Sequence, residues 1–464
     1  MSKVNSELAA AIAAASLAEG GPDIDGALEE IVAAAGSSVP VDIEALVPER
    51  PIGMGGQGGV WLAYDPTSGV KCAVKQIRKG RLSALPKKAA TRALVEREAL
   101  LEVGHHPFIT TLHAAFQNDT SLFFALELAP GGDLFGLLDM HPHGLPEAQA
   151  RFYCTCVALA LRHVHSHGWV YRDVKLENVL IDRDGYIKIC DFGFAKKAAS
   201  TRTFTKCGTD EYAPPEVVSG RGRSCAADWW ALGILLHEML TGRPPFEGSS
   251  AEEVSGNPDS PLRYLPQPLF LSLAMHPHAR DDVAITYPCS RAALAAMHVF
   301  FPVALRVACT HSIADALLPA PTCPIPPACP AQVFRSISEF SNGGSQAAER
   351  LQRAVLKAAE RISDTCAKFM MGLLTARESE RIGAGPAGFT QVMTHPWFAT
   401  VDWEATLRRK VPAPWKPPPN EEAPDYGINF TGEDVMINRP YDSDKWEETF
   451  SVFGPFRKAP WPEC

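Results

Sequence analysis

Tyr171-Arg172-Asp173-Val174-Lys175-Leu176-Glu177-Asn178 is followed, after a short strand-like run, by Asp191-Phe192-Gly193. Phosphoryl transfer needs a carboxylate that orients the attacking hydroxyl, a cation over the transferred group and oxygen ligands for magnesium. Asp173, Lys175, Asn178 and Asp191 supply these roles in that order. Asp-Phe-Gly alone occurs by chance in many proteins, but its place about thirteen residues after Arg-Asp-x-Lys-x-x-Asn is a specific signal. The two motifs together predict phosphoryl-transfer chemistry.

A glycine-rich stretch lies upstream of these motifs. Residues 53–60 read Gly-Met-Gly-Gly-Gln-Gly-Gly-Val, with the G-x-G-x-x-G-x-V spacing inside a predicted hairpin. Glycines let backbone amides close on phosphate oxygens because no Cβ stands in the way. The same pattern also occurs in ordinary glycine-rich turns, so by itself it is weak.

A lysine follows in the next apolar strand. About 15 residues beyond the glycine-rich stretch, Ala73-Val74-Lys75 places an ammonium group where it needs a compensating charge. Glu96 and Glu98 on the following predicted helix are the two candidates. The alternative for Lys75, taken in isolation, is a side chain that reaches solvent and has no function.

Composition narrows the class of protein. The 464 residues carry a formal net charge of −9, which argues against nucleic-acid binding because such proteins need clustered cations. The twelve cysteines contain no Cys-x-x-Cys pair, and no targeting signal or membrane-spanning segment is evident. We therefore expect reduced thiols and a soluble protein of the cytoplasm, with the nucleus as a further compartment.

The pattern of apolar residues predicts an α+β fold with two lobes. Residues 1–48 are expected to form a flexible arm, 49–128 a strand-rich lobe, 129–399 a mainly helical lobe, and 400–464 an extended tail held by aromatic side chains. The clearest predicted strands and helices are 59–64, 70–77, 91–103, 122–128, 147–167 and 228–241.

With these motifs in place, the chain resembles the eukaryotic protein kinases, and within them the AGC group, closest to the catalytic domains of the cAMP-dependent and cGMP-dependent kinases. Tyr171 before Arg172-Asp173, the Asp228-Trp229-Trp230 motif and the aromatic tail are typical of that group. The resemblance implies a two-lobed protein-kinase fold that uses ATP and Mg²⁺ to phosphorylate serine or threonine. Two departures are visible: Pro214-Pro215-Glu216 replaces Ala-Pro-Glu, and no aromatic residue caps the glycine loop at Gly56-Gln57.

The resemblance also implies a role for each site residue. The expected catalytic residues are Asp173, Lys175, Lys75 and Glu96, with Glu96 preferred over Glu98 from its spacing to His106-Pro107-Phe108. The expected nucleotide contacts are Ile52, Gly53, Gly55, Gly58, Val60, Ala73, Lys75, Glu127, Leu128, Asp133 and Phe430, and the expected magnesium ligands are Asn178 and Asp191. Arg381 is the expected partner of Glu216, with a surface arginine as the alternative.

Regulation and substrate choice are implied in the same way. Thr205 is the expected activation-loop phosphorylation site, with Arg172, Lys196, Arg202 and Arg92 as the cations around its phosphate. Asp133, Glu177, Glu211 and Glu238 match acidic positions that read arginines before the target residue, so basic peptide substrates are expected. The alternative is a generally acidic surface. A regulatory subunit or an upstream activating kinase is the expected partner, and nucleic acid and membrane are not.

The family pattern stops at Glu253 and resumes at Val333. Residues 254–332 have no sustained helical or strand period, and deleting them restores the family's spacing. Val254-Ser255 can be encoded by a splice-donor sequence and Gln332 by an acceptor, so one hypothesis is a translated retained intron. The alternative is a lineage-specific loop, since long surface insertions are tolerated. The competing function is a pseudokinase or scaffold whose chemistry the insertion impairs.

Overall fold

Five antiparallel strands form the first lobe of the computed structural model, in the order β1-β2-β3-β5-β4. They comprise β1 (Val47–Gly55), β2 (Gly58–Tyr64), β3 (Lys71–Arg78), β4 (Leu112–Gln117) and β5 (Ser121–Glu127). One face is apolar because alternate residues of each strand point the same way. Its buried cluster consists of Leu46, Ala63, Cys72, Val74, Phe116, Phe123, Ala125 and Trp461. The strands expected at 59–64, 70–77 and 122–128 are confirmed.

The structure describes residues 22–35, 41–55, 58–80, 91–197, 210–246, 362–384, 388–418, 450–458 and 461–462, with only the backbone given for residues 34, 35, 54, 55 and 210. Almost all belong to one compact unit formed by Met1–Pro245 and Ile337–Cys464. Phe430, Arg202, Thr205 and the predicted insertion 254–332 lie outside the described residues.

A helix follows β3 along the chain and belongs to the same lobe. Helix α5 (Arg92–Val103) buries Ala93, Ala99, Leu100 and Val103, as the predicted helix 91–103 requires. Glu96 is buried with them, at 2% exposure. A carboxylate on an apolar helix face needs a positive partner.

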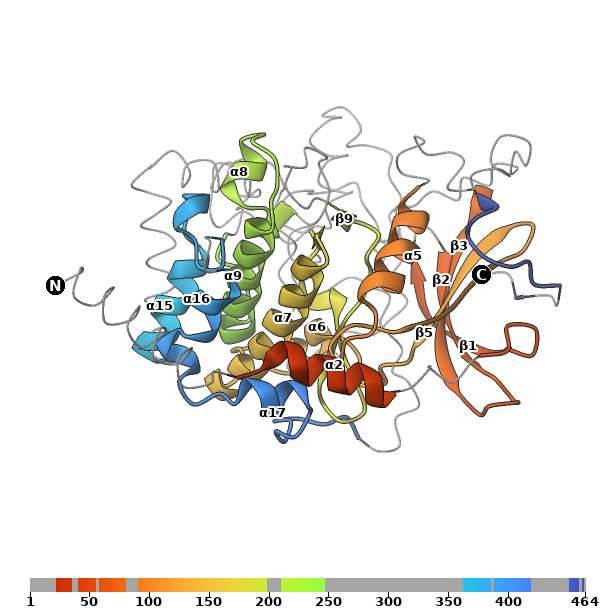
Figure 1. Ribbon diagram of the computed structural model, residues 1–464, viewed down its shortest axis with the longest axis horizontal. Helices are drawn as coiled ribbons and strands as arrows, with labels where there is room; N and C mark the ends of the chain where they lie inside the picture. The colour runs from red at the N-terminus through yellow and green to blue at the C-terminus, as the bar shows by residue number, and fades with distance from the viewer. Residues whose placement is uncertain are drawn as a thin grey trace, which may run out of the picture. The chain divides into compact units, whose positions relative to one another are not determined.

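The second lobe is mainly helical (Figure 1), which confirms the two-lobed α+β fold. Its longest helices are α7 (Glu147–Ser166) and α9 (Ala226–Thr241), close to the predicted 147–167 and 228–241. Almost every side chain of α9 is buried, so this helix forms the centre of the lobe. The remaining helices are α6 (Leu134–Asp139), α8 (Pro215–Val218), α15 (Asp364–Leu373), α16 (Phe389–Met393) and α17 (Trp403–Leu407).

Short strands and 3₁₀ turns also belong to the second lobe. They pair as β6 (Trp169–Val170) with β9 (Lys196–Lys197) and β7 (Val179–Ile181) with β8 (Ile187–Ile189). The 3₁₀ turns are η1 (Leu176–Asn178), η2 (Asp210–Tyr212), η6 (Glu378–Glu380) and η7 (Pro396–Phe398). The first of the two sequence motifs therefore lies between β6 and β7, and the second follows β8.

Residues on both sides of the predicted insertion build one lobe. Helix α15 packs on α9, and Arg381, which follows α15, forms two hydrogen bonds to Glu216 of α8, at 2.8 and 2.9 Å. The side chains of Arg381 and Glu216 are 0% and 1% exposed. The predicted partnership is confirmed, and it joins segments that lie more than 160 residues apart.

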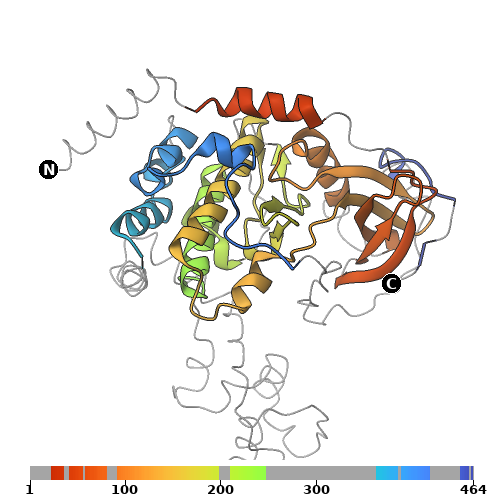
Figure 2. The same ribbon diagram turned by 90° about the horizontal axis from the view of Figure 1, so that it is seen from below.

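Within the predicted arm, residues 24–35 form helix α2, which lies beside α17 (Figures 1 and 2). Ile24 and Ala27 are buried, and Asp25 and Glu30 form ion pairs with Arg162 and Arg408. This stretch therefore has a fixed place on the second lobe, which the prediction of a flexible arm did not include.

From the sequence we expect no membrane-spanning segment and reduced cysteine thiols, and the structure describes part of the chain to which these expectations apply. None of its helices is long and apolar enough to cross a bilayer. Its six cysteines form no disulfide.

Candidate active site

The lysine predicted on β3 meets the helix glutamate. Lys75 Nζ lies 2.7 Å from Glu96 Oε1 and 3.0 Å from Oε2, so Glu96 and not Glu98 is its partner. Lys75 Nζ also lies 3.4 Å from Asp191 Oδ1. Burial opposes the charge on Lys75, but Asp191 and Glu96 outweigh it and raise the pKa of the ammonium group. Lys75 is therefore held protonated beside the residue expected to bind magnesium.

The catalytic-loop residues also converge. The Asn178 side-chain amide donates to the Asp173 carbonyl oxygen at 2.9 Å and to Asp173 Oδ2 at 2.6 Å, and Lys175 Nζ lies 3.5 Å from the same Oδ2. Asp173 is 3% exposed, and burial together with Asp191 raises its pKa above its ordinary value. Among the described residues Asp173 Oδ1 has no hydrogen-bond partner. A buried carboxylate oxygen of this kind can accept the proton of a substrate hydroxyl.

Asp191 lies on the other side of the same site. Burial would raise its pKa, but Lys75 lowers it, so the carboxylate stays ionised. Its Oδ1 accepts a hydrogen bond from Gly193 N at 3.1 Å. Because the Asn178 amide nitrogen is bound to Asp173, its carbonyl oxygen and the Asp191 carboxylate remain as hard oxygen donors.

This donor set fits magnesium. The part of the chain that the structure describes holds no group of three or more His, Cys, Asp or Glu side chains that would bind a metal unaided. Magnesium usually takes one or two protein oxygens and completes its shell with phosphate and water. Asn178 and Asp191 match that requirement.

Two residues of this region have a backbone conformation that non-glycine residues seldom adopt. Arg172 has φ 71° and Asp191 has φ 54°. Asp228, which is 1% exposed, holds the first of these turns by accepting hydrogen bonds from the amides of Tyr171 and Arg172 at 2.9 and 2.8 Å. The Tyr171 hydroxyl donates to the carbonyl of Cys190, next to Asp191. These hydrogen bonds hold the unusual backbone conformation of this region in place.

The positioning role of Asp228 is absent from the sequence predictions. Its motif was noted, but nothing in the spacing shows that a carboxylate on α9 binds the backbone of a loop 56 and 57 residues away. Arg223 was missed as well, although it donates to the Arg172 carbonyl at 2.9 Å. A hydrogen bond from a side chain to a distant stretch of backbone leaves no periodic pattern in the sequence, so it could not be predicted.

Four of the side chains predicted to contact the nucleotide, Ile52, Val60, Ala73 and Leu128, form one apolar cluster with Leu62. Ile52 and Leu62 are its buried core, and Val60, Ala73 and Leu128 pack against them. Gly53 pairs with Val60, and Gly55 with Gly58, in the β1–β2 hairpin. A Cβ on Gly58 would lie 1.8 Å from the carbonyl oxygen of Gln76, so only glycine fits there.

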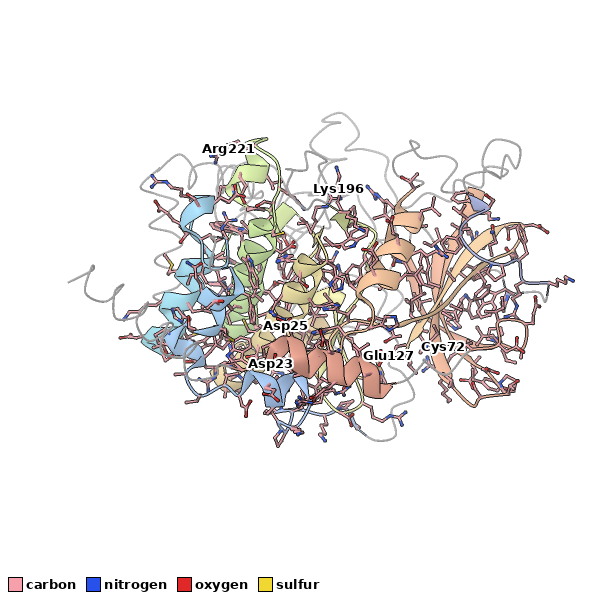
Figure 3. The ribbon with its side chains drawn as sticks, in the orientation of Figure 1. Asp23, Asp25, Cys72, Glu127, Lys196 and Arg221 are labelled. Atoms are coloured by element: carbon pink, nitrogen blue, oxygen red, sulfur yellow. The ribbon has the colours of Figure 1, made fainter. Side chains whose placement is uncertain are left out.

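Glu127 lies at the end of β5, between the strands and the helical lobe (Figure 3). Its carboxylate forms an ion pair with Lys188 at 2.8 Å, and its amide donates to the Thr111 carbonyl at 2.9 Å. The amide and the carboxylate are thus engaged within the protein. A nucleotide contact from Glu127, which stays a prediction, falls to its remaining backbone oxygen.

The four predicted acidic residues form one electrostatic group. Asp133 caps α6 through Gly136 N at 2.7 Å, and burial and then Glu177 raise its pKa. Burial raises the pKa of Glu238 to about 7, with Glu177 and Glu211 adding to the shift and a hydrogen bond from Tyr212 opposing it. Mutual repulsion of this kind marks a surface that a cationic ligand would stabilise.

Two of the four cations expected around Thr205 meet at Phe194. Arg172 Nε donates to the Phe194 carbonyl at 2.5 Å, and the Arg92 guanidinium lies 4.5 Å from the Phe194 ring centre. Lys196 is exposed on β9, opposite Val170. Thr205 and Arg202 lie outside the described residues, so the switch stays a prediction.

Comparison with known proteins gives the family. The sequence model of the protein kinase domain matches residues 46–299. The chain belongs to the protein kinase family. It is 42% identical over 209 residues to ribosomal protein S6 kinase alpha-2 of Mus musculus, covering 44% of this chain and 28% of that relative. It is 43% identical over 197 residues to the cAMP-dependent protein kinase catalytic subunit of Dictyostelium discoideum, covering 42% and 30%.

A longer alignment reaches beyond that core. Ribosomal protein S6 kinase alpha-6 of Danio rerio is 30% identical over 373 residues, covering 79% of this chain and 37% of that relative. The kinase therefore spans about a third of the length of the relatives it matches. The relatives are AGC kinases, which confirms the resemblance to that group.

Proposed function

We propose that this kinase transfers the γ-phosphoryl group of ATP to serine or threonine in basic, arginine-rich proteins. The observation that carries the proposal is the convergence of Lys75, Asp173 and Asp191: Lys75 Nζ lies within 3.4 Å of Asp191, and Asp173 keeps a buried oxygen without a partner among the described residues. Magnesium bound at Asn178 and Asp191 would supply charge neutralisation on the phosphates.

Each protein group has a separate task. Lys75, held by Glu96, orients the phosphates of the nucleotide. Asp173, fixed by Asn178 and Lys175, orients the substrate hydroxyl and accepts its proton, while Lys175 places a positive charge on the transferred group. The apolar surface of Ile52, Val60, Ala73 and Leu128 takes the adenine. Nothing in this sequence of tasks requires a covalent intermediate on the protein.

The acidic group supports the choice of substrate. The carboxylates of this group, Asp133, Glu177, Glu211 and Glu238, repel one another. Arginines of a bound peptide would relieve this repulsion and so lower the free energy of the complex. Control by a regulatory subunit, by cyclic nucleotide or by phosphorylation of Thr205 belongs to the same proposal, as does a place in the cytoplasm and nucleus.

A transfer assay tests the activity. Purified chain, radiolabelled ATP and magnesium are incubated with an arginine-rich peptide that contains one serine, and Asp173→Asn serves as the matched control. We expect label on the peptide only with the unchanged chain. Nucleotide binding without transfer would support the pseudokinase alternative instead. Equal labelling of a peptide in which the arginines are replaced by glutamine would refute the substrate class.

A further inference from the structure

The carboxylate of Glu102, near the end of α5, lies against the two-stranded ribbon of β6 and β9 (Figure 1). The Trp169 indole N–H of β6 donates to Glu102 Oε2 at 2.8 Å. Lys197 Nζ of β9 lies 2.6 Å from Glu102 Oε1 and 2.9 Å from Oε2. Trp169 and Lys197 lie opposite each other in the β6–β9 register, so one carboxylate binds both strands of the ribbon.

The ribbon is continuous with two loops of the active site. The loop that carries Asp173 begins directly after Val170, the last residue of β6. The loop that carries Asp191 ends at Lys196, the first residue of β9. The two strands pair through only two residues each, and a ladder of this length does not fix its own position. Contacts of its side chains with neighbouring elements therefore decide where the two active-site loops lie.

Helix α5 carries a second carboxylate that bonds to the active site, that of Glu96. Glu96 and Glu102 are six residues apart, which separates them by about 9 Å along the helix and places them on different faces. Glu96 bonds to Lys75 of the first lobe at 2.7 Å, whereas Glu102 bonds to the ribbon of the second lobe. The helix thus connects the lysine expected to orient the phosphates with the two active-site loops.

The two partners of Glu102 differ in how much they fix the ribbon. Hydrogen bonds from Lys197 and then Trp169 lower the pKa of Glu102 below its ordinary value, so its carboxylate is ionised at neutral pH. The side chains of Lys197 and Glu102 are 53% and 34% exposed, and water screens an ion pair of this kind. Trp169 is 1% exposed, so water is a poor substitute acceptor for its indole N–H. The bond to Trp169 therefore contributes more to the position of the ribbon.

We propose that Glu102 is a positioning residue for phosphoryl transfer: it fixes the β6–β9 ribbon on α5 and so aligns the two active-site loops with Lys75. The proposal rests on the proposed kinase function. Glu102 acts through the ribbon, because both of its carboxylate oxygens are bonded to the two strands. A side chain that offers an oxygen to the Trp169 indole should therefore replace it, and an apolar side chain should not.

The test compares full-length variants by single-turnover kinetics and by amide hydrogen exchange. Glu102→Leu is expected to slow phosphoryl transfer about 10- to 100-fold and to leave the affinity for ATP within about threefold, because small displacements of reacting groups cost up to about 100-fold. Amide exchange in residues 169–173 and 191–197 should become faster. Glu102→Gln keeps an oxygen for the indole, so its transfer rate should stay within about threefold. Glu98→Leu, which changes an exposed residue of the same helix, is the matched control.

Trp169→Phe covers the case in which Glu102→Leu does not fold, because it removes the indole N–H and keeps an aromatic ring. It should slow transfer as Glu102→Leu does. The double variant Glu102→Leu/Trp169→Phe should be no slower than either single variant, since both changes remove the same bond. Losses that multiply in the double variant would overturn the inference.

A lower melting temperature for Glu102→Leu or Trp169→Phe, with an unchanged transfer rate and unchanged exchange in residues 169–173, would overturn it as well. An inactive unchanged chain would refute the proposed function. In that case faster exchange of the two loops in Glu102→Leu would still support the positioning role of Glu102, and unchanged exchange would refute it.

Discussion

Replacing Arg381 with methionine tests whether the second lobe closes across the segment 247–361. The substitution leaves the Glu216 carboxylate, 1% exposed, without its cation, and it removes the donors to the carbonyls of Ala226 and Thr375. An unpaired buried charge costs about 3–5 kcal/mol. Since whole domains are stable by only about 5–15 kcal/mol, Arg381→Met should lose a large part of the free energy of unfolding.

Urea unfolding followed by tryptophan fluorescence measures this loss. The double variant Glu216→Met/Arg381→Met removes the unpaired charge and should recover about 2 kcal/mol or more relative to Arg381→Met. Arg377→Met is the control, because Arg377 pairs with Glu380 on the surface, where such a pair contributes about 0–1 kcal/mol. If Arg381→Met stays within about 1 kcal/mol of the unchanged chain, the residues after 362 do not pack on α8 and α9 as described.

Three further outcomes can be measured. Glu96→Gln should lower kcat/KM for ATP about 30- to 1000-fold, since truncating one partner of a buried charge pair costs about 2–4 kcal/mol, and an unchanged value would contradict the role of Lys75. Because the pKa of Glu238 is raised from 4.5 to about 7, its carboxylate ionises as pH rises through 7, so the KM for an arginine peptide should fall between pH 6 and 8. The same raised pKa makes Glu238 favour folding below pH 4.5, with that contribution lost as pH rises through 7, and Glu238→Gln should flatten both profiles. Gly58→Ala should weaken nucleotide binding and destabilise the hairpin by about 1–3 kcal/mol, and equal nucleotide affinity would count against the close approach to Gln76.

The chemistry of the site could be predicted because its residues occur in short motifs with fixed spacing. Asp173, Asn178 and Asp191 lie in short loops or turns next to a strand, and Lys75 is a charged residue inside the apolar strand β3, so each stands out from its surroundings. Spacing to His106-Pro107-Phe108 favoured Glu96 over Glu98, and the bonds from Lys75 to Glu96 confirm that choice. Glu96 lies on the buried face of α5.

Long-range bonds could not be predicted from the sequence. Asp228 binds the backbone of residues 171 and 172, and Arg457 binds carbonyls more than 400 residues earlier. Such bonds join a side chain to whatever backbone the fold brings near it, and any residue can supply that backbone. The fixed position of helix α2 on the second lobe was not predicted for a related reason. Its ion pairs with Arg162 and Arg408 depend on helices that are distant in sequence.

Residues 455–457, which bond to Gln117 at the edge of β4, and Trp461, which lies in the buried cluster of the sheet, have a consequence for biosynthesis. Trp461 belongs to the same buried cluster as Leu46 and Phe123, so the first lobe cannot complete its core until the ribosome has translated residue 461. At about 5–20 residues per second, the stretch from Glu127 to Trp461 takes roughly 15–70 s to translate. During that interval the nascent sheet presents an uncovered β4 edge and an unfilled aromatic site, which are features that chaperones bind.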